Sequence, residues 1–174
     1  ITVNDVNDSP TDIGLSNMSV NENADSNETV GTLSRTDVDS NDTASYTLES
    51  GDISYFNIDG TTLRATDAFD YETKSSYSLT IKVTDSGGLT YDKEFTITVN
   101  DVNEAPTDIV LSRMSINENG DSNETVGTLS RTDIDSDDTA TYTLESGDIS
   151  YFNIDGTTLS AKNSFDYETK PSYS

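Results

Sequence analysis

The sequence repeats itself, and this limits the possible folds more than any other feature. Residues 97–174 match residues 1–78 without a gap, and roughly four positions in five are identical. ITVNDVNDSPTDIGLSNMSVNEN at the start returns as ITVNDVNEAPTDIVLSRMSINEN from Ile97. A period of about 100 residues is the size of a small domain and too long for a solenoid unit. The sequence therefore predicts a tandem array of domains.

The repeat boundaries are out of phase with the ends of the sequence. Residues 1–10 match the end of the complete repeat, so we expect them to be the end strand of a preceding repeat plus a linker. Residues 11–100 form one complete repeat, residues 101–106 form the next linker, and residues 107–174 form a second repeat without the counterpart of 79–100. That missing stretch holds two expected strands. We expect either that the polypeptide continues past Ser174 or that another chain completes the second repeat.

Apolar residues alternate with polar ones at the period of a β-strand. Leu79, Ile81 and Val83 form one such row, and Phe95, Ile97 and Val99 form another. Turn-forming Asp, Asn, Ser and Gly clusters separate them from five further expected strands, at 11–16, 29–35, 45–49, 55–59 and 61–66. About seven short strands per repeat and no helical stretch predict an all-β fold. We expect tandem immunoglobulin-like Greek-key β-sandwiches, in which Phe56, Phe69, Phe95 and Tyr46 are core or edge residues.

The composition excludes several classes of function. The chain has 33 acidic and 9 basic residues, a formal net charge of −24, and neither Cys nor His. Such a chain has no electrostatic reason to approach nucleic acid. Disulfides, thiolate nucleophiles, Ser-His-Asp triads and His-ligated zinc are ruled out. No apolar run approaches the ~20 residues that cross a bilayer, so we expect no membrane insertion in this segment.

The acidic residues gather where strands are expected to end. The clusters lie at 5–8, 21–23, 37–39, 70–72, 85–88 and 101–104. Clustered carboxylates repel one another, and a hard divalent cation relieves that repulsion. Calcium suits oxygen ligands from irregular loops better than magnesium does. Charge alone equally allows the alternative that these loops are only solvated.

The order and spacing of these clusters resemble the cadherin repeat, especially the cadherin-like domains of large bacterial surface proteins. The family motifs are x-E-N, D-x-D, L-D-x-E, D-x-G and D-x-N-D-N-x-P. They correspond here to Asn21-Glu22-Asn23, Asp37-Val38-Asp39, Phe69-Asp70-Tyr71-Glu72, Asp85-Ser86-Gly87 and Asp101-Val102-Asn103-Glu104-Ala105-Pro106. Each motif is weak alone, but five motifs in this order within one β-strand repeat of about 100 residues are specific. The resemblance covers the whole chain.

The resemblance implies a ligand set of up to three Ca²⁺ ions at each junction between repeats. For the junction inside this chain it implies Glu22, Asp70, Glu72, Asp101, the carbonyl of Val102, Asn103, Glu104, Asp133 and Asp135. The upstream junction is represented by Asn7, Asp8, Asp37, Asp39 and Asp85, and the downstream one by Glu118, Asp166 and Glu168. The linker is one residue shorter than the family pattern and lacks its second Asn. Glu104 also stands where the first linker has Asp8, so the resemblance leaves the third ion open.

Two other readings of the carboxylates are weaker. Residues 37–42 resemble the start of an EF-hand loop, but the sixth position is Asp42 in place of Gly and the twelfth is Leu48 in place of Glu. Paired carboxylates also serve glycosidases, but a small sandwich offers little cleft for a polymer. We therefore predict no catalytic residues and no enzymatic activity.

The predicted function is that of a secreted or cell-surface repeat array, a spacer or stalk in cell adhesion that calcium makes rigid. Extracellular calcium modules bind at ~10⁻⁴–10⁻³ M, so cytosolic calcium would not fill them. The partners are neighbouring repeats of the same chain. The alternative is a module that itself binds cell-surface glycans or like repeats, with Tyr55, Tyr71, Tyr77 and Tyr91 as candidate sugar-stacking rings.

Overall fold

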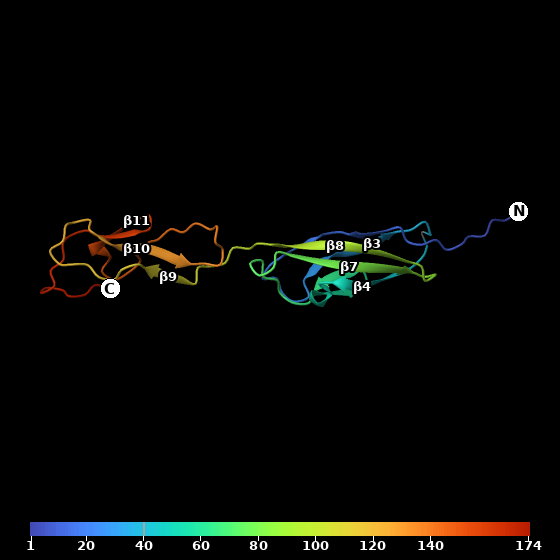
Figure 1. Ribbon diagram of the computed structural model, residues 1–174, viewed down its shortest axis with the longest axis horizontal. Helices are drawn as coiled ribbons and strands as arrows, with labels where there is room; N and C mark the ends of the chain where they lie inside the picture. Colours follow the sequence, from blue (N-terminus) through green and yellow to red (C-terminus); the bar gives the residue numbers. More distant parts are fainter. Residues whose placement is uncertain (40) are drawn as a thin grey trace. The chain divides into compact units, whose positions relative to one another are not determined.

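The computed structural model describes residues 1–39 and 41–174, which divide into two units (Figure 1). The first unit spans Ile1–Val102 and the second spans Asn103–Ser174. Residues 1–10 lie in no strand. Their assignment to a preceding repeat, like the other domain boundaries above, stays a prediction.

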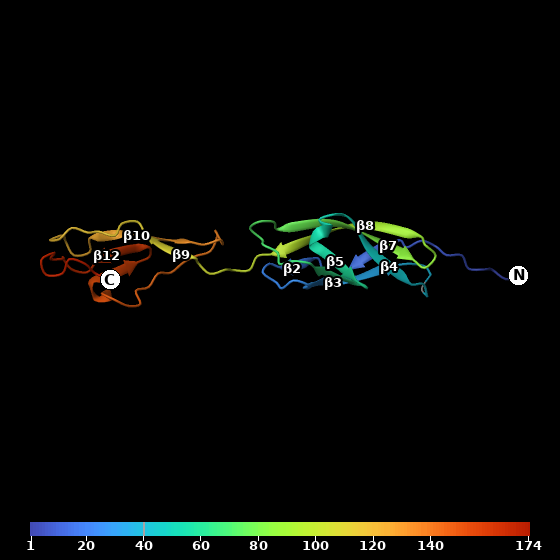
Figure 2. The same ribbon diagram turned by 90° about the horizontal axis from the view of Figure 1, so that it is seen from below.

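The first unit is a sandwich of two four-stranded sheets, which confirms the predicted fold class. In Figure 2, β8 of one sheet and β3 of the other lie on opposite sides of this unit. One sheet has the order β1 (Asp12–Leu15), β3 (Thr29–Thr36), β6 (Thr62–Ala65), β5 (Phe56–Asp59). The other has the order β2 (Ser19–Asn21), β8 (Thr90–Asn100), β7 (Ser76–Asp85), β4 (Ala44–Gly51).

The alternating rows predicted from the sequence form the core between the sheets. Leu79, Ile81 and Val83 of β7 are at most 1% exposed, and Phe95 and Ile97 of β8 pack in the same cluster. Phe56 and Phe69 are also buried and Tyr46 is partly buried, as expected. The inward row of β7 continues to Asp85, so this strand delivers a carboxylate to the end of the core.

The strand pattern alone did not reveal β2. This strand has three residues, too few for a recognisable alternation, and it pairs in parallel with Thr98–Asn100 of β8. The chain therefore crosses from one sheet to the other between Leu15 and Ser19. Every other strand pair in the described chain is antiparallel, and the β5-β6 and β7-β8 pairs are joined by short turns.

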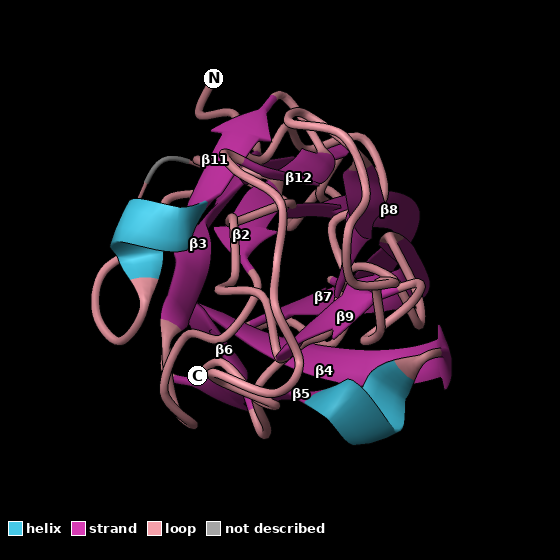
Figure 3. Ribbon diagram, turned by 90° about the vertical axis from the view of Figure 1, so that its left-hand side faces the viewer, coloured by secondary structure: helices cyan, strands magenta, loops and turns pink. Residues whose placement is uncertain are grey.

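Helical structure within the described residues is limited to two 3-10 turns of three residues, Ile53–Tyr55 and Ile149–Tyr151 (Figure 3). The strand expected at 55–59 accordingly starts at Phe56. Tyr55 packs on Tyr77 with 4.8 Å between ring centroids. Because Tyr77 is buried, its ring is not available to a sugar.

The second unit contains one sheet, in the order β11 (Phe152–Asp155), β12 (Thr158–Ala161), β10 (Thr125–Thr132), β9 (Asp108–Leu111). It is the counterpart of the β5-β6-β3-β1 sheet. Residues 115–117 and 140–147, the counterparts of β2 and β4, are not strands. The reason is that β2 pairs with β8 and β4 pairs with β7, and the sequence given holds no second copy of most of that hairpin.

Candidate metal centre

Two buried acidic side chains mark the opposite ends of the first unit. Asp85 is 6% exposed and Glu22 is 3% exposed. Asp85 ends β7 beside the start of β8, whereas the N–H of Glu22 donates to the carbonyl of Asn100 at the end of β8. A strand of 11 residues separates them, about 35 Å of extended chain. We call the two places the Asp85 end and the Glu22 end.

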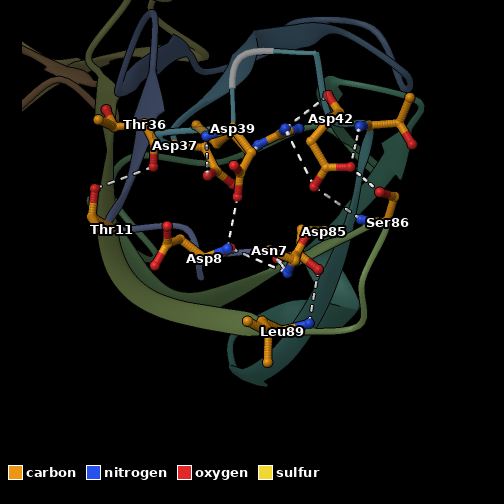
Figure 4. Close-up of polar contacts among 12 residues, drawn as sticks. Asn7, Asp8, Thr11, Thr36, Asp37, Asp39, Asp42, Asp85, Ser86 and Leu89 are labelled. Atoms are coloured by element: carbon orange, nitrogen blue, oxygen red, sulfur yellow. Dashed lines mark hydrogen bonds and ion pairs between the residues drawn. The ribbon is translucent and has the colours of Figure 1, made fainter. Parts of the chain in front are cut away.

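At the Asp85 end, the N-terminal segment is held between two loops (Figure 4). The Nδ2 group of Asn7 donates to Oδ2 of Asp85 at 3.0 Å, and the N–H of Asp8 donates to Oδ2 of Asp39 at 2.7 Å. The N–H of Asp39 donates to Oδ1 of Asp37 at 3.0 Å. The structure thus brings together all five residues predicted for the upstream junction, including the carbonyl-bearing side chain of Asn7.

The glycine of the D-x-G motif has a steric role at this end. A Cβ on Gly87 would lie 2.5 Å from the Nδ2 and Cγ atoms of Asn7. Glycine therefore leaves the space that the Asn7 side chain occupies when it reaches Asp85, and a Cβ there would displace that side chain. This close approach explains a motif position that offers no ligand atom of its own.

The carboxylate of Asp85 is held in its charged form. Burial raises its pKa, but hydrogen bonds from Asn7 and from the N–H groups of Leu89, Gly88 and Gly87 outweigh burial, so the net pKa lies below 3.8. The N–H of Leu89 donates to Oδ1 at 2.8 Å. A charged carboxylate at neutral pH is what a cation site needs.

We expect the calcium-free first unit to lose stability in acid through this group. Because the folded-state pKa of Asp85 is depressed, its contribution is complete above the unfolded value near 3.8 and is lost as the pH falls through the lower folded value. Asp85→Asn is expected to flatten this acid limb in chelator, as measured by urea unfolding between pH 5 and pH 2. Asp59→Asn, at an exposed site, is the matched control, and an equal flattening in both variants would contradict the assignment.

At the Glu22 end, one carboxylate accepts hydrogen bonds from two distant backbone segments. The N–H of Tyr71 donates to Oε2 of Glu22 at 2.8 Å, and the N–H of Val102 donates to Oε1 at 2.7 Å. One carboxylate oxygen of Glu72 lies within 4.8 Å of one of Glu22 and of one of Asp101. The structure therefore brings Glu22, Glu72 and Asp101 together, while Val102 contributes an N–H to this contact.

The neighbouring motif residues shape the backbone around Glu22. Asn23 adopts a left-handed conformation with φ 55°, which Asn tolerates better than most residues. Its N–H donates to the carbonyl of Phe69, joining the two loops. Asp70 accepts from the N–H and Oγ1 of Thr73, both at 2.8 Å, so it caps its own turn.

The second unit repeats these contacts with its own residues. The N–H of Glu104 donates to Oδ2 of Asp135 at 2.7 Å, the same contact as Asp8 to Asp39, and the N–H of Asp135 lies 3.3 Å from Oδ1 of Asp133. The amide of Asn103 donates to the carbonyl of Glu104. Oxygens of Glu118, Asp166 and Glu168 lie within 4.8 Å of one another. Hydrogen bonds from the side chain and N–H of Thr169 lower the pKa of Asp166.

Asp42 also belongs to the Asp85 end, although no motif in the sequence predicts it. Carboxylate oxygens of Asp37, Asp42 and Asp85 lie within 4.8 Å of one another. Asp42 also accepts hydrogen bonds from the N–H and hydroxyl of Ser86. The one signal for Asp42 in the sequence is its recurrence in the second repeat as Asp138. The residue before it changes from Asn41 to Asp137. An open cavity of about 440 Å³ lies beside it, lined by Asp5, Asn7, Val38, Asp39, Asn41 and Asp42.

Together, the fold and the paired clusters define an all-β sandwich repeat with groups of acidic side chains at both ends. Residues 16–100 match the sequence model of the cadherin domain. Most of the complete repeat is thus a cadherin domain, which confirms the resemblance stated from the sequence. The bacterial subgroup stays a prediction.

Solved structures support the same fold. Human protocadherin-24 EC1-2 is 21% identical with a TM-score of 0.77, covering 95% of this chain and 82% of that one. The human desmocollin-1 ectodomain is 22% identical with a TM-score of 0.67, and the match covers 93% of this chain but 35% of that ectodomain. Human mucin-like protocadherin EC1-2 is 22% identical with a TM-score of 0.59, covering 92% and 83%. No curated protein matches the sequence.

Cadherin domains are extracellular adhesion modules that generally bind Ca²⁺. The acidic groups of this chain fit that property, because hard carboxylate and amide oxygens are the ligands calcium prefers. The described residues include no helix with the length and apolar character needed to span a membrane.

Proposed function

We propose that the chain is a segment of a secreted or cell-surface adhesion array in which calcium stiffens the connections between repeats. The observation that carries the proposal is the presence of charged oxygen clusters at both ends of one sandwich, around Asp85 and around Glu22. Clusters at both ends suit a repeat that shares ions with a neighbour on each side. In this reading the repeats set length and stiffness.

The proposed ligands are those expected from the sequence, with Asp42 added at the Asp85 end. Asp37, Asp39 and Asp85 supply carboxylates and Asn7 an amide oxygen. Support for the second unit comes from Asp135, whose Oδ1 is buried and accepts no hydrogen bond from the described residues. A buried carboxylate oxygen without a donor is unfavourable unless a cation pairs with it. We propose that Glu22, Asp70, Glu72 and residues 101–104 serve the same junction as Asp135, the one between the two repeats of this chain. We also propose that each junction holds up to three ions.

Calcium supplies the positive charge that these clusters lack. Without it, neighbouring carboxylates repel and the linker between repeats rotates; with it, oxygens from several segments share one ion. The residues themselves position the oxygens: Asn7 and Asp8 tie the N-terminal segment to Asp85 and Asp39, and Val102 ties the linker to Glu22.

Small-angle scattering of the 174-residue chain tests this function. We expect one extended dimension in 5 mM calcium and a broader distribution of dimensions in chelator, because only the calcium form has fixed connections. Magnesium at the same concentration is the control for ionic strength. Identical scattering in calcium, magnesium and chelator would contradict calcium stiffening.

A second candidate is association with like repeats. One structural neighbour, protocadherin gammaB7 EC3-6, is described as a cis-dimer. Glycan binding has weaker support, because one of its four candidate rings, Tyr77, is buried. Sedimentation of the calcium-loaded chain as a function of concentration distinguishes a dimer from a spacer that stays monomeric.

A further inference from the structure

A partly buried arginine in the inward row of β3 reaches the carboxylates of the Asp85 end. Arg35 lies near the end of β3, two residues after the buried Leu33, and its side chain is only 13% exposed. The inward row of β7 ends at Asp85 in the same way. The inward-facing residues of β3 thus end with the positive Arg35, and those of β7 in the opposite sheet end with the negative Asp85.

The guanidinium of Arg35 contacts two of the three clustered carboxylate residues. Its Nε donates to Oδ2 of Asp37 at 3.2 Å, and its Nη2 donates to the carbonyl of Asp42 at 2.7 Å and lies 3.9 Å from Oδ2 of Asp42. The side chains of Asp37 and Asp42 are 3% and 9% exposed. Because a guanidinium cannot lose its proton in a protein, this neutralisation is permanent.

The second unit contains the corresponding pair of arginine–carboxylate contacts. Nε of Arg131 lies 2.8 Å from Oδ2 of Asp133, and Nη2 lies 3.9 Å from Oδ2 of Asp138. Asp138 is 41% exposed, whereas Asp42 is held by Ser86, a residue whose counterpart is absent from the sequence given. The contact between Arg131 and Asp133 therefore forms without counterparts of Asp85 and Ser86.

We propose that Arg35 is a built-in cation of the Asp85 end, which lowers its affinity for calcium and holds its loop in place when calcium is absent. This inference rests on the proposed calcium function. The guanidinium of Arg35 lies against Asp37, which is one of the proposed ligands. Its positive charge therefore repels a calcium ion bound to Asp37. Arg131 has the same role in the second unit. The two arginines thus set the calcium concentration at which these positions fill.

Calcium titration of Arg35→Met tests the proposal, with Arg64→Met as the matched control. Met keeps the apolar stem but removes the charge. Among the described residues, the Arg64 guanidinium donates to Oγ1 of Thr29 and to the carbonyl of Asn27, away from the cluster. By Coulomb's law in a water-like dielectric, removing one positive charge a few ångströms from a divalent ion strengthens its binding by roughly tenfold. We expect that gain, or one additional bound ion in native mass spectrometry, for Arg35→Met alone.

The calcium-free proteins give a second readout. In chelator, Arg35→Met should increase amide hydrogen exchange in residues 37–39 and 41–43, while Arg64→Met leaves it unchanged. Arg35→Lys keeps the charge and guards against misfolding of the Met variant; it should bind calcium as the parent does. Equal calcium binding by the Arg35→Met and Arg64→Met variants would overturn the role of Arg35 alone. A parent chain that binds no calcium would overturn the proposed function as well.

Discussion

Saturating calcium is expected to raise the melting temperature of the 174-residue chain by about 10–20 °C relative to chelator. An extracellular module with a dissociation constant of ~10⁻⁴ M, in 10 mM calcium, gains about 2.7 kcal/mol per site because the ion binds the folded state only. For a domain of 60–100 residues, each kcal/mol shifts the melting temperature by about 4–8 °C. Differential scanning calorimetry across a calcium titration measures the shift directly.

The comparison of two Asp→Asn variants makes this experiment specific. Asp39 accepts the N–H of Asp8 inside the Asp85 end, whereas Asp59 is exposed at the end of β5. Asp39→Asn should reduce the calcium-dependent rise, and Asp59→Asn should leave it intact even though both remove one charge. A melting temperature that does not depend on calcium would show that these clusters are only solvated surface.

The sandwich was predictable because its signal is local. Leu79, Ile81 and Val83 alternate over a long strand, and their burial follows from that pattern alone. β2 was not predictable in the same way, because three residues carry no periodicity and its parallel partner in β8 is distant in sequence. The repeat also predicts a strand in the second unit at residues 140–147, the counterpart of β4. That segment is not a strand in the structure, because a strand there needs a partner and the residue pattern alone is not enough.

The residues of the candidate site were predictable where they belong to a sequence motif. They were not predictable where they join the site through contacts between distant segments. Asp37, Asp39 and Asp85 were expected from their motifs, and the structure places them with Asn7. Asp42 was missed because it joins the group through Ser86, a contact between loops that spacing does not encode. Arg35 was missed for another reason: in the sequence it is one of few cations in an acidic chain, and only the sheet shows that it points inward.

The acidic residues behind the net charge of −24 fall into two groups, those paired with lysines and those gathered at the ends of the repeat. Some carboxylates are already paired within the protein: Lys74 lies 2.6 Å from Asp52 and Lys82 lies 2.8 Å from Glu49. The second pair joins β7 to β4, and hydrogen bonds from the lysines lower the pKa of both acids. The carboxylates at the two ends have few such cations, which is why we assign calcium to the ends of the repeat.

Glu22→Gln is expected to have the largest effect of any single substitution at the candidate site. The Glu22 carboxylate accepts two N–H groups at 2.8 and 2.7 Å while only 3% exposed, and the amide can present one oxygen at most. One of the N–H groups of Tyr71 or Val102 would then face an NH₂ group in a buried place. Losing a hydrogen bond to a charged group costs about 1.5–3 kcal/mol, so we expect a loss of that size in urea unfolding in chelator.

Glu118→Gln is the matched control for this change, because Glu118 is the same residue one repeat later. It is exposed, and the structure gives it one such contact, from the N–H of Tyr167 at 3.2 Å. We expect it to lose little stability in chelator. Both residues are proposed ligands, but calcium should widen the difference, since the junction of Glu22 includes residues 101–104 of this chain and that of Glu118 has no such linker in the sequence given. If both variants lost the same stability in chelator, the buried carboxylate would not be what fixes Val102 and the linker to the first repeat.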